Sequence, residues 1–410
     1  MTPEAALAEL TAAFGQTYHA SDQACRLISD LLSHAMVGIS SRYTTRRSFI
    51  EIVYAKEMPI TAMEPLAITG LAGVGKSQLL QAVGRVLPAD DLLAVDSSHG
   101  EFPLQSLWHV ELSVRQSILP MLTLIAERAG APQSAGKTVD RVLARLRSLA
   151  YRNGVAVLAI DEFQGINQGS NANSLATRLL LMLREIGTTL VYVTNFSLMH
   201  RLKSRNQEDR QRLLTKVRVL ERDDLDSPDW RALVDSYIRV APGVFDIDGV
   251  RDSARLWCWT AGLPRMLRFL LLAAYQLARS KGEFTVGMSM CEAAYRSESF
   301  SVMREDVELL ASQAITRQPI PGRGDLNPPY PHGSWAPENA VAAMLEQETQ
   351  SRTRANLLDC LTPAERAEFK RQSRSSKTEP RKRQRKQGAA GTDDVMHNLA
   401  SFKETFVAPK

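Results

Sequence analysis

Short apolar runs alternate with amphipathic segments through the first half of the chain, and this alternation indicates the architecture. Most of the runs are almost wholly apolar, as expected for strands that are buried on both faces of a parallel sheet, although the run at 107–114 also contains His109, Glu111 and Ser113. The runs span residues 66–68, 107–114, 155–160 and 189–193. Between them, apolar residues recur at helical spacing over 78–86, 117–128, 139–151 and 175–186. The pattern predicts an α/β core, a parallel sheet with helices on both faces.

Helical periodicity without strand-like runs flanks this core. Residues 5–36 contain two helical segments separated near Ser21, and another helix is expected from Ser48 to Lys56. After Pro228, helical spacing returns over 230–240, 250–260, 264–279 and 286–296, and prolines and glycines then gather between 319 and 333. We therefore expect an N-terminal helical region at 1–57, the α/β core at 58–225, a small helical domain at 226–316, and a Pro-rich linker with a basic, largely disordered tail at 317–410.

Composition is typical of a globular protein and excludes several classes. The 410 residues are 44% hydrophobic and 23% charged, and they contain no apolar run of the roughly 18 residues that a membrane span needs. The N-terminus lacks a signal-peptide pattern, and the four cysteines contain no CxxC pair. We expect a cytoplasmic protein with no membrane partner and without structural zinc or disulfides.

The positive charge is concentrated in one segment. Residues 370–386 hold nine lysines and arginines and a single glutamate, a sum of +8, whereas the whole chain is +5, so the remainder is 5 − 8 = −3. Such a tail can neutralise nucleic-acid phosphates without reading sequence, although basic tails also serve as solvated appendages.

The strongest motif follows the first apolar run directly. Residues 70–77 read Gly-Leu-Ala-Gly-Val-Gly-Lys-Ser, a complete GxxxxGK[ST] phosphate-binding loop. Glycines let successive backbone N–H groups face phosphate oxygens, and the following helix adds the positive end of its dipole. Lys76 is expected to reach the β and γ phosphates, and Ser77 to bind Mg²⁺. The expected ATP-binding residues here are Gly70, Gly73, Val74, Gly75, Lys76, Ser77 and Gln78.

Two later strands end in polar residues that suit hydrolysis. Asp161 and Glu162 follow the run at 155–160, the Walker B pattern, in which Asp161 orients Mg²⁺ and Glu162 polarises the attacking water. Asn195 follows the run at 189–193, and its amide can both donate to and accept from the γ phosphate or water. A plain turn after a strand is the alternative reading of Asn195.

Arginines supply the remaining candidates. A dense basic run precedes the last core strand, and in a ring one of its arginines, Arg210 or Arg212 and then Arg205, could reach the neighbouring subunit's γ phosphate. A solvated charged face is the alternative. Gly262-Leu263-Pro264-Arg265 opens a helix of the small domain, where Arg265 could sense the β and γ phosphates.

This ordered set of motifs resembles the AAA+ ATPases, specifically the initiator-like branch with the TnsC/TniB transposition regulators of Tn7-like transposons, some of them CRISPR-associated. The resemblance covers about residues 35–300 and depends on the phosphate loop, Asp161-Glu162-Phe163-Gln164, Asn195, the 205–212 stretch and Gly262 to Arg265. It implies a P-loop NTPase core with a helical lid domain and an extended C-terminal tail.

The resemblance also implies a function. Such proteins assemble on duplex DNA with ATP as a ring or helical filament, hexameric to heptameric per turn, link a TniQ/TnsD-type target selector to a TnsA/TnsB-type transposase, and disassemble on hydrolysis. The tail would tether the transposase, and the location would be the bacterial cytoplasm. Candidate DNA contacts are Arg42, Arg46, Arg47 and Arg115.

Two alternatives remain open at this point. In the first alternative the protein is still an ATPase but acts on a different partner, as in a helicase loader or replication-initiator relative. The other is a nucleotide-switched signalling or defence adaptor, which predicts repeat or effector domains that the sequence does not show.

Overall fold

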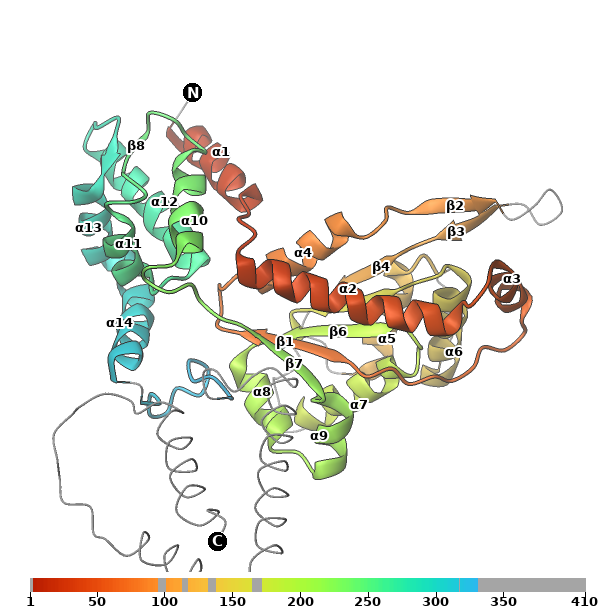
Figure 1. Ribbon diagram of the computed structural model, residues 1–410. Coiled ribbons are helices and arrows are strands. Elements are labelled where there is room, and N and C mark those ends of the chain that lie inside the picture. Colours follow the sequence, from red (N-terminus) through yellow and green to blue (C-terminus); the bar gives the residue numbers. More distant parts are fainter. Residues whose placement is uncertain are drawn as a thin grey trace, which may run out of the picture. The chain divides into compact units, whose positions relative to one another are not determined.

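The computed structural model describes residues 3–94, 101–112, 117–131, 138–163, 172–316 and 318–330 (Figure 1). The candidate residues and motifs named above fall within these ranges except for Gln164, Arg115 and the basic tail, which lie outside the described residues.

A five-stranded sheet forms the centre of the core, with strand order β4-β5-β6-β1-β7. Its strands are β1 (Leu66–Gly70), β4 (Leu107–Glu111), β5 (Val157–Asp161), β6 (Thr189–Thr194) and β7 (Lys216–Leu220). Every pairing is parallel, and every residue of β1, β5 and β6 is buried. The sheet confirms the predicted α/β fold, and it places β6 between the two strands that carry the nucleotide motifs.

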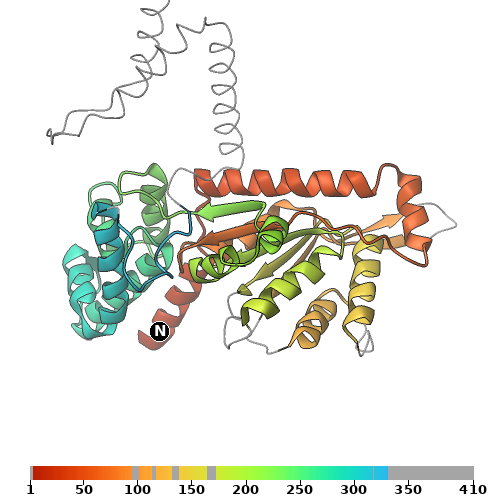
Figure 2. The ribbon, with the colours of Figure 1, turned by 90° about the horizontal axis from the view of Figure 1, so that it is seen from below.

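Helices cover both faces of the sheet, as the alternation of the sequence predicts. On one face, α2 (Asp22–Arg42) and α4 (Lys76–Val86) pack against Val157 and Ala159 of β5. On the other, Leu158 and Ile160 contact a cluster built from α5 (Ile118–Arg128), α6 (Val139–Arg152), α7 (Ala172–Arg184) and α8 (Phe196–Lys203) (Figure 2). The alternation along β5 follows from the two-residue period of a strand.

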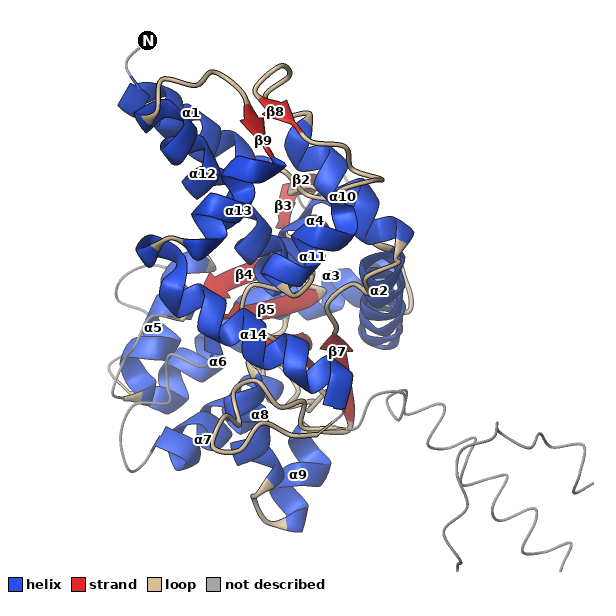
Figure 3. Ribbon diagram, turned by 90° about the vertical axis from the view of Figure 1, so that its left-hand side faces the viewer, coloured by secondary structure: helices blue, strands red, loops and turns tan. Residues whose placement is uncertain are grey.

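A third hydrophobic cluster lies among the helices of the lid, and Figure 3 shows the arrangement of these helices. The lid helices are α10 (Pro228–Ile238), α11 (Ser253–Thr260), α12 (Pro264–Ser280), α13 (Met288–Arg296) and α14 (Ser301–Thr316), with short strands β8 (Phe245–Asp246) and β9 (Val286–Gly287). Trp230 is fully buried there, and its indole N–H donates to the carbonyl of Ser253 at 2.9 Å.

The first helix packs with the lid although it is far from it in sequence. In α1 (Pro3–Gln16), Phe14 is 0% exposed, and its ring centroid lies 5.1 Å from that of Tyr237 and 5.9 Å from that of Phe245. By contrast, α2 packs on the sheet, so the two N-terminal helices belong to different hydrophobic clusters.

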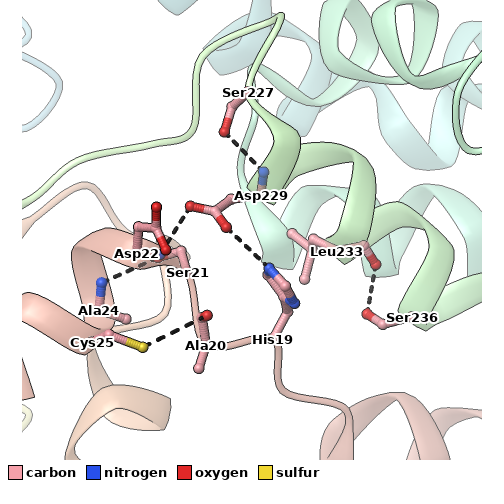
Figure 4. A network of polar contacts seen from close by, with 10 residues as sticks. All are labelled: His19, Ala20, Ser21, Asp22, Ala24, Cys25, Ser227, Asp229, Leu233 and Ser236. Carbon is pink, nitrogen blue, oxygen red and sulfur yellow. Dashed lines mark hydrogen bonds and ion pairs between the residues drawn. The ribbon is translucent and has the colours of Figure 1, made fainter.

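The α1–α2 connector is tied to the start of α10 (Figure 4). The ring of His19 lies 3.3 Å from Asp229 Oδ1, and the backbone N–H of Asp22 donates to Asp229 Oδ2 at 2.9 Å. Ser21 caps α2 by accepting from the N–H of Ala24. One lid carboxylate therefore holds the connector from two sides.

Some elements differ from the sequence expectations. The hairpin of β2 (Asp91–Ala94) and β3 (Glu101–Leu104) was not predicted, because its strands are short and largely exposed and so lack an apolar run. The strand expected over 107–114 ends at Glu111. Two short elements complete the description, α3 (Arg46–Tyr54) and α9 (Gln207–Leu213). Among the described helices, none has both the length and the apolar character to cross a bilayer.

Truncating Phe14 tests the packing of α1 on the lid. We expect Phe14→Ala to lower the free energy of unfolding by about 3–5 kcal/mol, the usual cost of removing a buried Phe side chain. Thermal and urea denaturation of the full chain measure this loss, and Glu9→Ala, at an exposed position of the same helix, is the matched control. Equal stability of the two variants would contradict the packing.

Candidate functional site

The phosphate loop joins the buried strand β1 to α4, and its glycines are needed for backbone conformation. Gly73 and Gly75 have φ angles of 83° and 108°, in the left-handed region that favours glycine. A Cβ atom on Gly73 would lie 2.7 Å from Cβ of Arg265, and one on Gly70 would collide with the carbonyl oxygen of Leu220. The loop therefore lies directly against the lid helix α12 on one side and β7 on the other.

Lys76 opens α4 and points back over the loop. Its ammonium donates to the carbonyls of Gly70 at 3.0 Å and Leu71 at 2.8 Å. Burial, and secondly the nearby charge of Arg265, lower the pKa of Lys76 to about 8, while Glu162 and Asp161 oppose the shift. The lysine is held beside the loop by weak carbonyl partners that phosphate oxygens can replace.

The two carboxylates follow β5 at the same sheet edge. Asp161 is 1% exposed, and its Oδ1 accepts from the N–H of Glu162 at 2.8 Å, whereas its Oδ2 is buried with no hydrogen-bond partner in the described part of the chain. Buried carboxylate oxygens normally have a partner. A hard cation held also by the Ser77 hydroxyl would supply one, so these residues fit Mg²⁺, which binds one or two protein oxygens together with phosphates.

Glu162 has a strained backbone. Its φ of 54° is unusual for a residue other than glycine, and such conformations concentrate at functional sites. The strained turn directs this carboxylate into the same cleft as Lys76 and Ser77.

Asn195 has a structural task as well as a place in the cleft. It caps α8, because its Oδ1 accepts from the N–H of Leu198 at 3.0 Å. With the carbonyl used in this way, the amide N–H₂ is the part that can donate to a ligand. Since β6 lies between β5 and β1, Asn195 stands between the carboxylates and the phosphate loop.

The lid closes the cleft through the first turn of α12. Leu263 is buried, Pro264 occupies the first turn of the helix, and the backbone N–H of Arg265 donates to the carbonyl of Gly73 at 3.2 Å. The resulting cleft has a volume of about 320 Å³. Of the predicted residues, it is lined by Gly73, Gly75, Lys76, Ser77, Gln78, Asp161, Glu162, Asn195 and Arg265.

Val74 lines a second cavity that shares Gly75, Gln78 and Pro264 with the first. The connector residues Tyr18 and His19 also line it, and Gln78 holds that connector by donating to the carbonyl of Thr17 at 3.2 Å. This second cavity is small, with a volume of about 40 Å³, and it adjoins the phosphate cleft. Sequence reasoning missed Tyr18 and His19 because the connector carries no motif.

The three arginines considered for a neighbouring subunit's γ phosphate lie in α9 or, for Arg205, just before it, and none of them lines either cavity in the described part of the chain. Arg205 forms a two-pronged ion pair with Asp209, at 3.1 and 2.9 Å, and Arg212 pairs with Glu208 on the surface. Arg210 is exposed, with no ion pair to any described carboxylate. The guanidinium that is most available to another molecule is therefore that of Arg210.

The DNA candidates have different surroundings. Arg42 donates to the carbonyl of Val155, and its guanidinium carbon lies 5.3 Å from the ring centroids of both Tyr43 and Tyr151. These contacts within the chain stabilise the fold. Burial lowers its pKa. Arg46 and Arg47 are exposed at the start of α3, where Arg46 donates to the carbonyl of Ala94 and Arg47 pairs with Glu51. Arg115 lies outside the described residues.

Comparisons with known proteins agree with the class that this geometry defines. Residues 62–202 match the family model described as AAA domain, and the chain therefore carries an AAA-type nucleotide-binding domain. No match was found among curated proteins.

Distant likenesses occur among solved structures. The Aeropyrum pernix Orc1 protein in complex with DNA is 21% identical, with a TM-score of 0.42 over 67% of this chain and 68% of that chain. The Aeropyrum pernix Orc2 protein is 14% identical, with a TM-score of 0.47 over 72% and 74%. Cdc6p from Pyrobaculum aerophilum is 15% identical, with a TM-score of 0.44 over 77% and 81%. The class assignment rests on the family match together with the sheet order and the phosphate loop.

The pKa of Lys76 gives a pH dependence for nucleotide binding. Below about pH 8 the free protein holds the charged ammonium, so affinity should be level. Above it, binding must first return a proton to Lys76, and ATP affinity should fall by up to about tenfold per pH unit.

Calorimetric titration with ATP across this range measures the effect. Because the charge of Arg265 contributes to the lowered pKa, Arg265→Ala should move the midpoint of the fall to higher pH. An affinity that stays constant well above pH 8 would contradict the expected dependence of ATP binding on the protonation of Lys76.

Proposed function

We propose that this protein is an ATP-hydrolysing molecular switch whose active site is completed by a second copy of the chain. The observation that carries the proposal is the convergence of Lys76, Glu162 and Arg265 on one cleft, without any of the α9 arginines. Phosphoryl transfer needs positive charge around the γ phosphate. An exposed Arg210 suits delivery of that charge to a neighbouring subunit.

The residues divide the work of hydrolysis between them. ATP would lie with its phosphates along Gly70 to Ser77, displacing the carbonyl contacts of Lys76. Ser77 and Asp161 would hold Mg²⁺, which would supply positive charge against the phosphates. Glu162 would polarise the attacking water, and Asn195 would donate a hydrogen bond from its amide to the γ phosphate or to that water. Arg265 would contact the γ phosphate, so that the position of the lid depends on whether this phosphate is present.

We assign the switch to DNA transposition, as a TnsC/TniB-type regulator. The order of the motifs supports this assignment, since Asp161-Glu162-Phe163-Gln164 and the Gly262 to Arg265 turn resemble that branch. In this role the ATP-bound chain assembles as a ring or filament on duplex DNA and links a TniQ/TnsD-type selector to a TnsA/TnsB-type transposase. Exposed Arg46 and Arg47 and the basic segment 370–386 are the proposed phosphate contacts.

Two variants separate nucleotide binding from hydrolysis. Lys76→Ala should abolish ATP-dependent association with DNA, because the phosphates lose their buried cation. Glu162→Gln should trap the assembled state, because it keeps the cleft but cannot activate water. Gel shifts of duplex DNA with ATP and with a non-hydrolysable analogue measure both, and equal DNA binding with no nucleotide at all would refute the switch.

Arg210 can be tested by complementation between subunits. Arg210→Ala should retain ATP binding and lower the rate of hydrolysis by at least about 10³-fold, in keeping with other arginine fingers. Mixing it with Glu162→Gln, which should still assemble, should restore activity, since one variant supplies the intact cleft and the other the arginine. Arg212→Ala, whose native partner is Glu208, is the matched control and should hydrolyse normally. Full activity of Arg210→Ala alone would remove this residue from the mechanism.

A further inference from the structure

Helix α12 brings a second arginine to the cleft. Arg265 and Arg268 are three residues apart, so they project from one face of the helix, with Arg268 about 4.5 Å further along the axis. Both line the cleft that contains Lys76, Asp161 and Glu162. Nothing in the motif order points to Arg268, because it lies beyond the Gly-Leu-Pro-Arg turn.

The surroundings of Arg268 leave its charge available on the cleft side. Its Nε is buried and has no hydrogen-bond partner in the described part of the chain, and its guanidinium carbon lies 5.4 Å from the ring centroid of Phe269. An unpaired buried donor on a charged group costs free energy unless a ligand accepts from the group. Burial raises the pKa of Tyr237, and Arg268 counteracts that rise, which places its charge at the lid end of the cleft.

The charges that line the cleft also suit an anion. Lys76, Arg265 and Arg268 contribute three positive charges, and Asp161 and Glu162 two negative ones, so the lining carries 3 − 2 = +1. Without Arg268 the lining would be neutral. ATP with its Mg²⁺ retains negative charge, and each added cation in a partly buried cleft attracts it further.

We propose that Arg268 binds the phosphate chain of the nucleotide and acts with Arg265 as a two-arginine clamp from the lid. The inference rests on the proposed function, since it assumes that the cleft takes ATP. Because both arginines belong to one helix, the phosphate chain interacts with two positive charges of α12 when the lid lies over it.

Binding of three probes to the full chain tests the clamp in the presence of Mg²⁺. We expect Arg268→Ala to weaken the binding of ATP and of inorganic tripolyphosphate by about tenfold each, the usual scale for one charge-assisted hydrogen bond. Adenosine, which has no phosphates, should bind within about twofold of the wild-type affinity by the same argument. Arg268→Lys should recover most of the loss because it keeps the charge.

Arg279→Ala is the matched control. Arg279 stands on the same helix, but its guanidinium lies over the rings of Tyr275 and Phe284, at 4.9 and 5.3 Å, and it lines a different cavity. This variant should bind all three probes as the wild type does.

The outcomes separate this inference from the proposed function. If the wild-type chain binds neither ATP nor tripolyphosphate, both fail. If the wild type binds both but Arg268→Ala binds them equally well, or loses adenosine binding to the same extent, the nucleotide site stands and the clamp is refuted.

Discussion

The approach of α12 to the phosphate loop at Gly73 is the contact on which the whole site depends. There the backbone N–H of Arg265 donates to the carbonyl of Gly73, and the space between them admits no Cβ atom on the loop. A side chain at Gly73 would push the lid away from the loop. Since the lid supplies one wall of the cleft, Arg265 and Arg268 can line it only while this contact holds.

The rest of the molecule keeps the two walls in place. The parallel sheet brings the ends of β1, β5 and β6 to one edge. Gly70, Asp161 and Asn195 therefore lie at the same edge although they are far apart in the chain. On the lid side, α1 completes the hydrophobic cluster around Trp230. The connector to α2 then returns to the sheet, and Asp229 holds it at His19 and at the N–H of Asp22. Lid and core are thereby joined both at the phosphate loop and through the connector.

Much of the fold could be predicted because the buried strands are continuous apolar runs. β5 and β6 were placed within two residues of their observed bounds and the lid helices α10 to α13 within three, whereas α14 was not among the predicted helices. The hairpin β2–β3 could not be predicted, because exposed strands have no apolar pattern to reveal them. Arg42 shows that charge in the sequence is a similarly limited guide to function. A basic residue near other basic residues suggests a phosphate contact, but stacking between Tyr43 and Tyr151 gives this one a place inside the fold.

The sequence by itself determined the chemistry of the phosphate loop, the two carboxylates and the α/β class, because these depend on residue types at short, regular spacings. Only the tertiary structure decided which arginines share the cleft. Arg205, Arg210 and Arg212 lie away from it, whereas Arg268, which carries no motif, lines it beside Arg265. The reason is physical: a motif encodes local backbone geometry, but the distance between a side chain and a distant loop depends on how α12 packs against the core.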